Sequence, residues 1–344
     1  MTDLPIYRMK ALTDIWTGSV VLEEKGGKLK ERIVPDRLVP TGLLGSIRWW
    51  FEVVVRGLGG GACDPSRHQC PDHRKAPADP GHHCVACELF GCTGGARKFR
   101  FDVLDESDKI QQRQIKRGQS FQLRFTPPRP VAPEEWALLD LTLRLIARYG
   151  AMGSKTVCKP SDEPSRQGAV HHRDYGLVVI EGAPKVQRKS KKALGAYVKA
   201  PRWRIVEHGS FAWASLEHFW CVPGRYLARQ QTKKSAFNRV VGRKEDKSIK
   251  ERKGRRVVRW SDLLQDETDQ ESEWLAGSRG ESKKVFSFKD PESARRTFGF
   301  VQAPDKLVEM RQRLRKKAWR NLKNDEFVKG ADVLTNLLDQ GGAA

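Results

Sequence analysis

Residues 60–100 read GGACDPSRHQCPDHRKAPADPGHHCVACELFGCTGGARKFR, a cysteine-rich segment that leads directly into a basic, aromatic strand. Five of the seven cysteines lie here, and Cys63, Cys70, Cys84 and Cys87 have the spacing C-x6-C-x13-C-x2-C. Zinc takes four sulfur or nitrogen ligands in a tetrahedron, and a C-x2-C pair supplies two of them from one tight turn. The spacing therefore predicts a structural zinc site, with further candidate ligands at His68, His73, His82, His83 and Cys92. Free thiols in a loop are the alternative, and a disulfide is disfavoured in an unsecreted chain.

The composition indicates a polyanionic partner. The chain has 344 residues, enough for two cores of ordinary size, and 64 Lys and Arg against 42 Asp and Glu. A net charge of +22 and an isoelectric point near 9.9 exceed what solubility requires. The N-terminal MTDLPIYRMK lacks the apolar core of a secretory signal, and no amphipathic anchor or long apolar run appears. We expect a cytoplasmic protein with reduced thiols and no membrane association.

The charge is concentrated in runs. Residues 185–204 hold eight basic side chains and no acidic one, and residues 225–259 hold fourteen basic against three acidic. Because both runs are poor in periodic apolar residues, we expect loops or arms that a partner neutralises. An acidic run follows at residues 262–273, and a basic helical pattern at residues 311–323.

The first half has a readable order of elements. Strand patterns lie at residues 6–12, 97–104, 121–125 and 175–180, and helical spacing lies at residues 41–55 and 133–149. A polar loop follows the first strand, and the cysteine segment is inserted after the first helix. The order β-α-β-β-α-β is the ferredoxin-like arrangement, an α+β fold that RNA-recognition modules also use. Glycines in the loop Tyr149–Gly176, together with Ser154, Lys155 and Lys159, would suit phosphate groups, but the spacing is not that of a nucleotide triphosphate loop.

Several ordered phrases resemble the RAMP proteins of CRISPR systems, and most closely the family of first subunits of the type III-B Cmr effector complex. They are LTDIWTG (12–18), PTGLLGSIRWWFE (40–52), RGLGGGACDP (56–65), CVACELFGCTGGARKFRF (84–101) and YGAMGSKTVCKP (149–160). These phrases span most of residues 1–180. The phrases KKVFSFKD (283–290) and RTFGFV (296–301) resemble the C-terminal half of the family more loosely.

The resemblance implies two tandem ferredoxin-like RAMP domains. The first would cover residues 1–183 with the cysteine-rich insertion at 60–95, and the second residues 184–344 with the basic arms. It implies a non-catalytic subunit for antiviral defence that caps the 3′ end of the crRNA and helps to capture target RNA. Its partners would be crRNA, target RNA, other RAMP subunits and the large subunit of a Cmr complex.

Apart from that resemblance, the residue types in PTGLLGSIRWWFE (40–52) suit contact with RNA. Thr41-Gly42 would present backbone N–H groups at a helix N-terminus, where the helix dipole favours a phosphate. Arg48 would pair with phosphate, and Trp49 would stack on a base, whereas Trp50 is expected to be the core tryptophan. The predicted RNA contacts are Thr41, Gly42, Gly45, Arg48, Trp49, Arg97, Lys98, Arg100, Gly153, Ser154, Lys155, Lys159, His171, His172 and Arg173.

Two other functions fit parts of the sequence. Related RAMP folds include guide-processing endoribonucleases with a histidine general base, and His171 with His172 could serve in that role. Simple RNA contact explains the pair equally well. A zinc-bearing protein associated with ribosomes or tRNA fits the charge and the cysteines, but not the ordered phrases.

Overall fold

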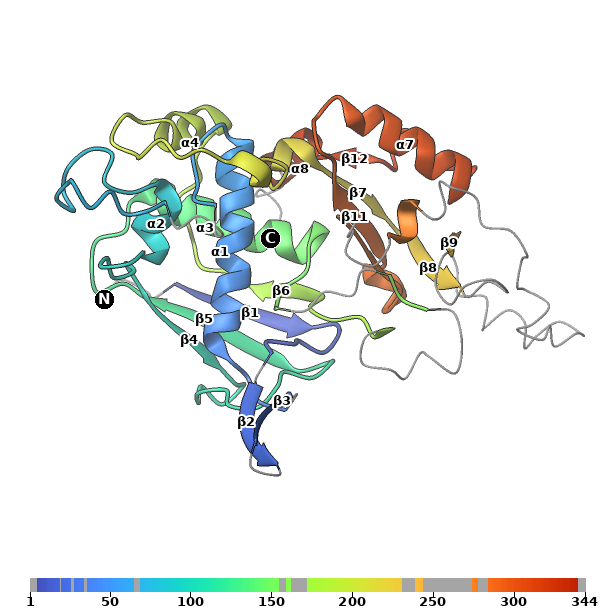
Figure 1. Ribbon diagram of the computed structural model, residues 1–344, viewed down its shortest axis with the longest axis horizontal. Coiled ribbons are helices and arrows are strands. Elements are labelled where there is room, and N and C mark those ends of the chain that lie inside the picture. Colours follow the sequence, from blue (N-terminus) through green and yellow to red (C-terminus); the bar gives the residue numbers. More distant parts are fainter. Residues whose placement is uncertain are drawn as a thin grey trace, which may run out of the picture. The chain divides into compact units, whose positions relative to one another are not determined.

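The chain forms two compact units in a computed structural model (Figure 1). The structure describes residues 5–18, 20–25, 28–33, 36–64, 69–154, 159–161, 172–230, 239–243, 274–277 and 284–339. Unit 1 comprises residues 1–155, 175–217 and 330–344, and unit 2 comprises residues 156–174 and 218–329. Both units are interrupted in sequence, so their limits differ from the expected segments 1–183 and 184–344.

Unit 1 is built on a four-stranded antiparallel sheet. Its elements are β1 (Ile6–Ala11), β2 (Val20–Lys25), β3 (Lys28–Ile33), α1 (Pro40–Gly57), α2 (Val85–Phe90), β4 (Arg100–Leu104), β5 (Ser120–Thr126), α3 (Pro133–Tyr149), β6 (Val178–Gly182), α4 (Lys191–Val198) and α8 (Gly330–Asp339). The strand order is β4-β5-β1-β6, and each neighbouring pair is antiparallel. Helix α1 contacts β4, α3 contacts β6, and the two helices contact each other. The predicted α+β class is confirmed, and this sheet has the expected order of strands and helices.

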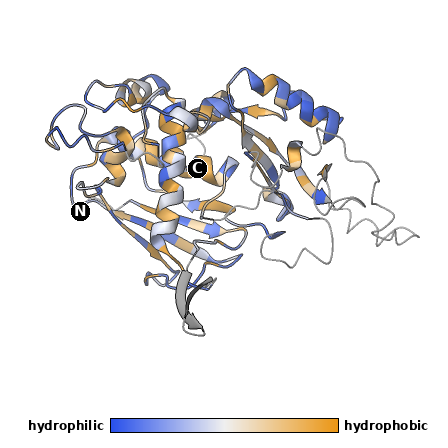
Figure 2. Cartoon of the chain, viewed as in Figure 1, coloured by the Kyte–Doolittle hydropathy of each residue, from blue (hydrophilic) through white to orange (hydrophobic). Residues whose placement is uncertain are grey.

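Alternation along the strands builds the core beneath the helices (Figure 2). Tyr7 and Met9 of β1 are fully buried, whereas Arg8 between them is exposed. Phe125 of β5 packs against Phe99 and Phe101, with ring centroids 5.1 and 5.3 Å apart. Burying each such side chain contributes about 1.5–3 kcal/mol. The period of two predicted from the sequence is therefore the period that the core uses.

Helix α1 is anchored by Trp50, as predicted. Its side chain is only 3% exposed, and its indole Nε1 donates to the Ala151 carbonyl at 2.8 Å. Gly150 ends α3 against this ring, because a Cβ at Gly150 would lie 2.6 Å from the Trp50 Cζ2. Trp49 is half-buried, so of the two tryptophans it is the one with an accessible surface.

The structure corrects two expectations for loops. The polar loop predicted after the first strand contains the antiparallel hairpin β2–β3. The sequence Gly26-Gly27 between two short alternating stretches is the signal that could have predicted it. The basic run at 185–204 contains helix α4, because Ser190 caps its N-terminus through Ala193 N–H and Leu194 and Val198 are buried one turn apart. The high content of basic residues led the sequence analysis to overlook the apolar pair Leu194 and Val198.

Unit 2 contains a second antiparallel sheet with strand order β10-β11-β7-β12. Its elements are β7 (Phe219–Pro223), β8 (Tyr226–Gln230), β9 (Arg239–Arg243), β10 (Val285–Phe288), β11 (Arg296–Phe300), α7 (Lys306–Lys317) and β12 (Val328–Lys329). Trp220 stacks on Phe327 in its core at 5.6 Å between ring centroids. The basic helix predicted at 311–323 is α7, which begins and ends earlier. Between β7 and β10, the described residues form the β8–β9 hairpin and one helical turn at 274–276.

Three 3-10 turns complete the described elements, η2 (Gly209–Phe211), η3 (Leu216–His218) and η5 (Glu292–Ala294). No helix within the described ranges has the length and apolar character needed to cross a bilayer. The acidic run at 262–273 lies outside the described residues.

Candidate metal centre and nucleic-acid interface

The four predicted cysteine ligands come together in unit 1. Cys63 and Cys70 lie in the segment after α1, Cys84 is the N-cap of α2, and Cys87 lies within α2. Their sulfur atoms all lie within 4.8 Å of one another, and the Cys63 Sγ is 3.6 Å from the sulfurs of both Cys84 and Cys87. Zinc–sulfur bonds of about 2.3 Å in a tetrahedron place the sulfurs about 3.8 Å apart. A disulfide would require about 2.05 Å, so the cluster has the dimensions of a metal site.

The surroundings of the cluster also suit four thiolates around a divalent cation. The backbone N–H of Cys84 donates to the Cys70 Sγ at 3.3 Å, and Arg48 Nη2 donates to the Cys87 Sγ at 3.2 Å. Donors of this kind stabilise the thiolate form that zinc requires. The residues present therefore fit a structural zinc ion.

The other candidate ligands are not part of this group of four. His83 pairs with Glu88, and His82 Nδ1 lies 2.7 Å from His83 Nδ1. The His83 hydrogen bond lowers the pKa of Glu88 to about 2, with help from Lys98. Cys92 is half-buried beside the cluster. His73 is exposed, and His68 lies outside the described residues.

Arg48 connects α1 to the cysteine cluster. Its Nε donates to Glu52 Oε1 at 2.9 Å, and its Nη1 donates to the Gly91 carbonyl at 2.8 Å, in addition to the bond to Cys87. Glu52, 2% exposed, also pairs with Arg56 at 3.7 Å. Burial raises the pKa of Glu52, while the two arginines oppose that shift. The phosphate contact predicted for Arg48 stays a prediction, and it would require some of these bonds to be exchanged.

Sequence reasoning missed the buried row formed by Glu52 and Arg56. Arg56 donates to the carbonyls of Cys63 and Ala214 at 2.8 and 2.9 Å, so it fixes the segment that begins the metal cluster. The spacing of Arg48, Glu52 and Arg56 at i, i+4 and i+8 is the signal that could have identified the row. A cavity of about 510 Å³ lies beside the cluster, and the half-buried Trp49 forms part of its wall.

The glycine loop, residues 150–154, packs against the turn after β1 and the first turns of α1. Gly153 N–H donates to Ser46 Oγ at 3.0 Å, and Ser154 N–H donates to the Trp16 carbonyl at 2.9 Å. Gly153 has φ +113°, and a Cβ there would lie 2.6 Å from the Trp16 oxygen, so only glycine fits without strain. The structure thus places Gly153 and Ser154 beside the start of α1.

The positive charge at the N-terminus of α1 is not offset by a carboxylate of its own first turn. The first turn contains no acidic residue, and the N-cap residue Val39 has no side chain that could cap it. Thr17 Oγ1 accepts from Val39 N–H at 2.8 Å, and a Cβ at Gly42 would lie 2.6 Å from the Thr17 carbonyl oxygen. Thr41 and Gly45 are exposed. The positive end of the dipole of this 18-residue helix therefore lies next to the glycine loop.

The other predicted contacts are scattered. Lys98 is engaged with Glu88 and, at 2.9 Å, with Glu135, so its ammonium group is used inside unit 1. The Arg100 side chain is 69% exposed and lies 3.1 Å from Asp102.

The contacts predicted after the glycine loop fall in unit 2 or outside the described residues. Lys159 is 3% exposed in unit 2, where its Nζ donates to the Val285 carbonyl at 3.4 Å. His172 is also buried in unit 2, and Arg173 is exposed there. In unit 1 Arg97 is half-buried. Lys155 and His171 lie outside the described residues.

A known family model matches the N-terminal part of the chain. Residues 8–157, which include α1, β4, β5 and α3 but not the edge strand β6, match the family model of the RAMP superfamily. This segment is therefore similar to the RAMP superfamily, the group that the ordered phrases resemble.

Two solved structures are weakly similar to this chain. The crystal structure of apo Cmr1 from Pyrococcus furiosus is 10% identical in sequence, with coverage of 88% of this chain and 89% of that chain and a TM-score of 0.40. A chain of a type IV-B CRISPR complex is 12% identical, with coverage of 55% of this chain and 93% of that chain and a TM-score of 0.30. No curated protein sequence matches this chain.

Proposed function

We propose that this protein is a non-catalytic RNA-binding subunit of a type III-B CRISPR effector complex. It would cap the 3′ end of the crRNA and help to capture target RNA in antiviral defence. The observation that carries the proposal is the meeting of the glycine loop with the acid-free N-terminus of α1, inside the segment that matches the RAMP superfamily. The ordered phrases that resemble the first Cmr subunit supply the choice of complex.

The chemistry of this junction favours a phosphate. The N–H groups of Gly42 and Leu43 already donate to the Val39 carbonyl, so the attraction would come from the Thr41 N–H and the helix dipole, which favour an anion without requiring a particular base. Gly42 and Gly153 are both held against the Thr17 and Trp16 carbonyls, so the two backbones lie close together. Recognition of this kind positions an RNA strand, while guide–target pairing reads its sequence. The net charge of +22 supports the same class of partner.

The proposal includes an architectural role for the metal and the second unit. Zinc on the four cysteines would fix the insertion after α1, and Arg48 would transmit that constraint to the helix that begins at the RNA junction. The equal strand order of the two sheets supports a tandem pair of ferredoxin-like domains. Other RAMP subunits, the large subunit, crRNA and target RNA are the partners that this role requires, in the cytoplasm.

A non-catalytic role is also the simpler account of the histidines. A general base must reach a ribose 2′-hydroxyl directly or through one water. His172 is only 6% exposed, so its ring is poorly accessible to a ribose hydroxyl. The reactions of the complex would then reside in its other subunits.

Substitution of the exposed Thr41 tests the RNA junction. Thr41→Glu places a carboxylate in the first turn of α1, which favours the helix by about 0.3–1 kcal/mol but repels a phosphate. Thr41→Gln is the matched neutral control. We expect Thr41→Glu to weaken crRNA binding by at least about tenfold, with an unchanged or higher melting temperature, and Thr41→Gln to bind nearly as well as the unmodified protein. Equal crRNA binding by the two variants would contradict the proposed junction.

A further inference from the structure

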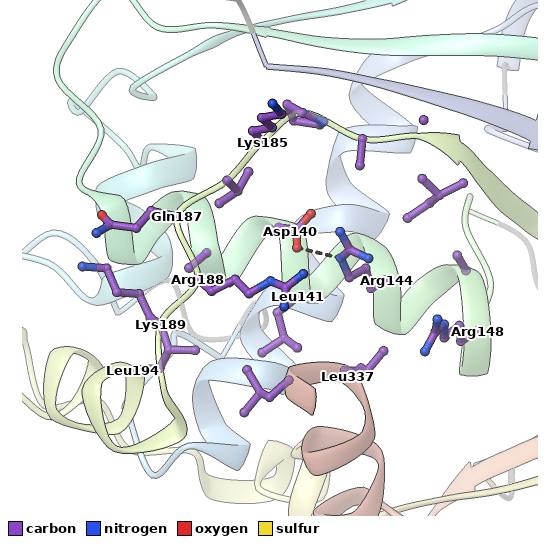
Figure 3. Close-up of a pocket in the computed structure, with 18 of the residues that line it drawn as sticks. Asp140, Leu141, Arg144, Arg148, Lys185, Gln187, Arg188, Lys189, Leu194 and Leu337 are labelled. Carbon is purple, nitrogen blue, oxygen red and sulfur yellow. Dashed lines mark hydrogen bonds and ion pairs between the residues drawn. The ribbon is translucent and has the colours of Figure 1, made fainter. Parts of the chain in front are cut away.

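A basic groove on unit 1 lies apart from the residues predicted to bind RNA. It has a volume of about 680 Å³ and runs along the outer side of α3, between that helix and the connection at residues 183–189 (Figure 3). Strand β6 closes one side, and α8 contributes Leu337 and Leu338. Its size falls within the range of ordinary ligand sites, and its walls come from elements of the same unit.

Positive charge predominates in this groove. Its basic side chains are Arg144, Arg148, Lys185, Arg188 and Lys189, and its acidic ones are Asp140 and Glu181. Asp140 is already matched, because Arg144 Nε donates to it at 2.7 Å and the Tyr7 hydroxyl donates at 3.1 Å. Glu181 accepts from the Ser120 hydroxyl at 3.0 Å and lies 3.9 Å from the Lys10 ammonium. The acidic residues of the groove are therefore satisfied within the unit.

Two of the basic side chains are left for a ligand. Lys185 and Arg188 are exposed, and neither forms a hydrogen bond or ion pair with the described part of the chain. Figure 3 shows Arg188 extending from the connection toward Leu141 of α3. Lys189, by contrast, pairs with Glu134 at 2.9 Å. The Arg188 guanidinium and the Lys185 ammonium could therefore donate to a phosphate without breaking an ion pair of the described chain.

The geometry points to a second RNA site: we propose that this groove binds the phosphate backbone of a single-stranded RNA segment. The inference rests on the proposed RNA-binding function and adds a second contact surface to it. Arg144 and Arg148 lie one turn apart on α3, and Arg148 precedes the glycine loop by two residues. Ala137 and Arg148 are about 16 Å apart along the helix, at 1.5 Å per residue. The groove could therefore extend the path of a strand that meets the glycine loop.

An RNA backbone suits the groove better than a peptide does. The edge strand β6 offers backbone groups on its outer side, which could also accept a peptide strand. However, Glu181 and Gly182 interrupt any continuous apolar face on β6, and the charge excess needs a polyanion. The groove wall contains no aromatic ring, so base stacking contributes little. Binding should consequently be insensitive to sequence and strongly dependent on salt.

The test is a double substitution, Lys185→Ala with Arg188→Ala, in the full-length protein. The probe is a fluorescein-labelled oligouridylate, titrated at several salt concentrations. The matched control is Lys191→Ala with Lys192→Ala, which removes the same charge from two exposed residues at the start of α4 that do not line the groove. We expect the groove variant to bind about five- to thirtyfold more weakly and the control to bind within about twofold of the unmodified protein.

The salt dependence gives a second readout. Each lost phosphate contact lowers the slope of log affinity against log salt by about 0.7 for single strands, so the groove variant should lose about 1.4. Lys185→Arg with Arg188→Lys should restore both values, which separates lost charge from lost folding. Affinity and slope equal to those of the unmodified protein would overturn the inference.

Other outcomes separate this inference from the function on which it rests. Unchanged RNA affinity with lost incorporation into the effector complex would identify the groove as a protein-binding surface and overturn the RNA site. If Thr41→Glu has no effect but the groove variant does, the junction at α1 is wrong and the groove stands. If the unmodified protein does not bind RNA, both proposals fail.

Discussion

Replacement of one of the four clustered cysteines should reduce the zinc content and the stability of the protein. We choose Cys84→Ser, because Cys84 is fully buried, caps α2 and holds its sulfur 3.6 Å from that of Cys63. A serine oxygen is a shorter and harder ligand, so it leaves a tetrahedral thiolate site incomplete. The freshly purified, reduced protein should contain one zinc per chain, and Cys84→Ser should contain much less.

The expected effect on stability follows from linkage between metal binding and folding. At free zinc 1,000-fold above the dissociation constant, binding stabilises the folded state by about 4 kcal/mol. For a unit of about 150–250 residues, each kcal/mol corresponds to about 2–4 °C in melting temperature, so metal loss should lower it by about 8–16 °C. The insertion lacks an extensive apolar core of its own, and Arg48 and Arg56 would keep Glu52 but lose part of the thiolate charge that they also face. Elemental analysis and thermal unfolding, each with and without a chelator, measure the two effects.

Cys92→Ser is the matched control, since Cys92 lies beside the cluster but outside the group of four. It should retain its zinc and its chelator-dependent melting temperature. Reduced protein without metal would refute the reasoning. Zinc retained by Cys84→Ser but lost from Cys92→Ser would show that the ligand set is wrong.

Three further predictions concern Arg48, the histidine pair and a buried carboxyl. Arg48→Ala should lower stability by about 1–3 kcal/mol and speed chelator-driven zinc release, with partial recovery in Arg48→Lys, because Arg48 links Glu52 to a cluster sulfur; unaltered melting and release kinetics would contradict this. Alanine at both His171 and His172 should leave target cleavage by the assembled complex unchanged in single-turnover assays at saturating RNA, and a slower rate in intact complexes would make them catalytic. Burial raises the pKa of Asp174 from 3.8 to about 7, so the folded state binds the extra proton, and stability should fall as pH rises from about 4 to 7. Asp174→Asn should flatten that decline and add about 1–3 kcal/mol at pH 8, whereas a variant less stable than the parent at pH 8 would oppose the assignment.

Local patterns in the sequence were sufficient for the sheet of unit 1 and for the four cysteines that the fold brings together. The alternation of apolar and polar residues at β1 and β5 follows from the two faces of a strand, and cysteine spacing can be read directly from the sequence. Both patterns are local, so they need no knowledge of distant contacts. The role of Arg48 could not be predicted in this way, because its partners Gly91 and Cys87 are 43 and 39 residues away. The pairing of Lys98 could not be predicted for the same reason, since Glu135 is 37 residues away in sequence. A basic side chain is available to a phosphate only if no carboxylate of the folded chain has already paired with it.

That condition also explains why the strongest basic signals in the sequence and the best available charges in the structure are different residues. Arg48 and Lys98 belong to the ordered phrases, yet both contribute to the interior of unit 1 through ion pairs. Lys185 and Arg188 come from a run whose composition suggested only a loop, yet the fold leaves them exposed at the edge of a defined groove. A buried ion pair is costly to break, whereas an exposed, unpaired cation releases only counterions when it meets a phosphate. We therefore propose that affinity for RNA depends on the connection between β6 and α4 together with the glycine-loop junction, and that Arg48, beside the four cysteines, maintains the shape of that junction.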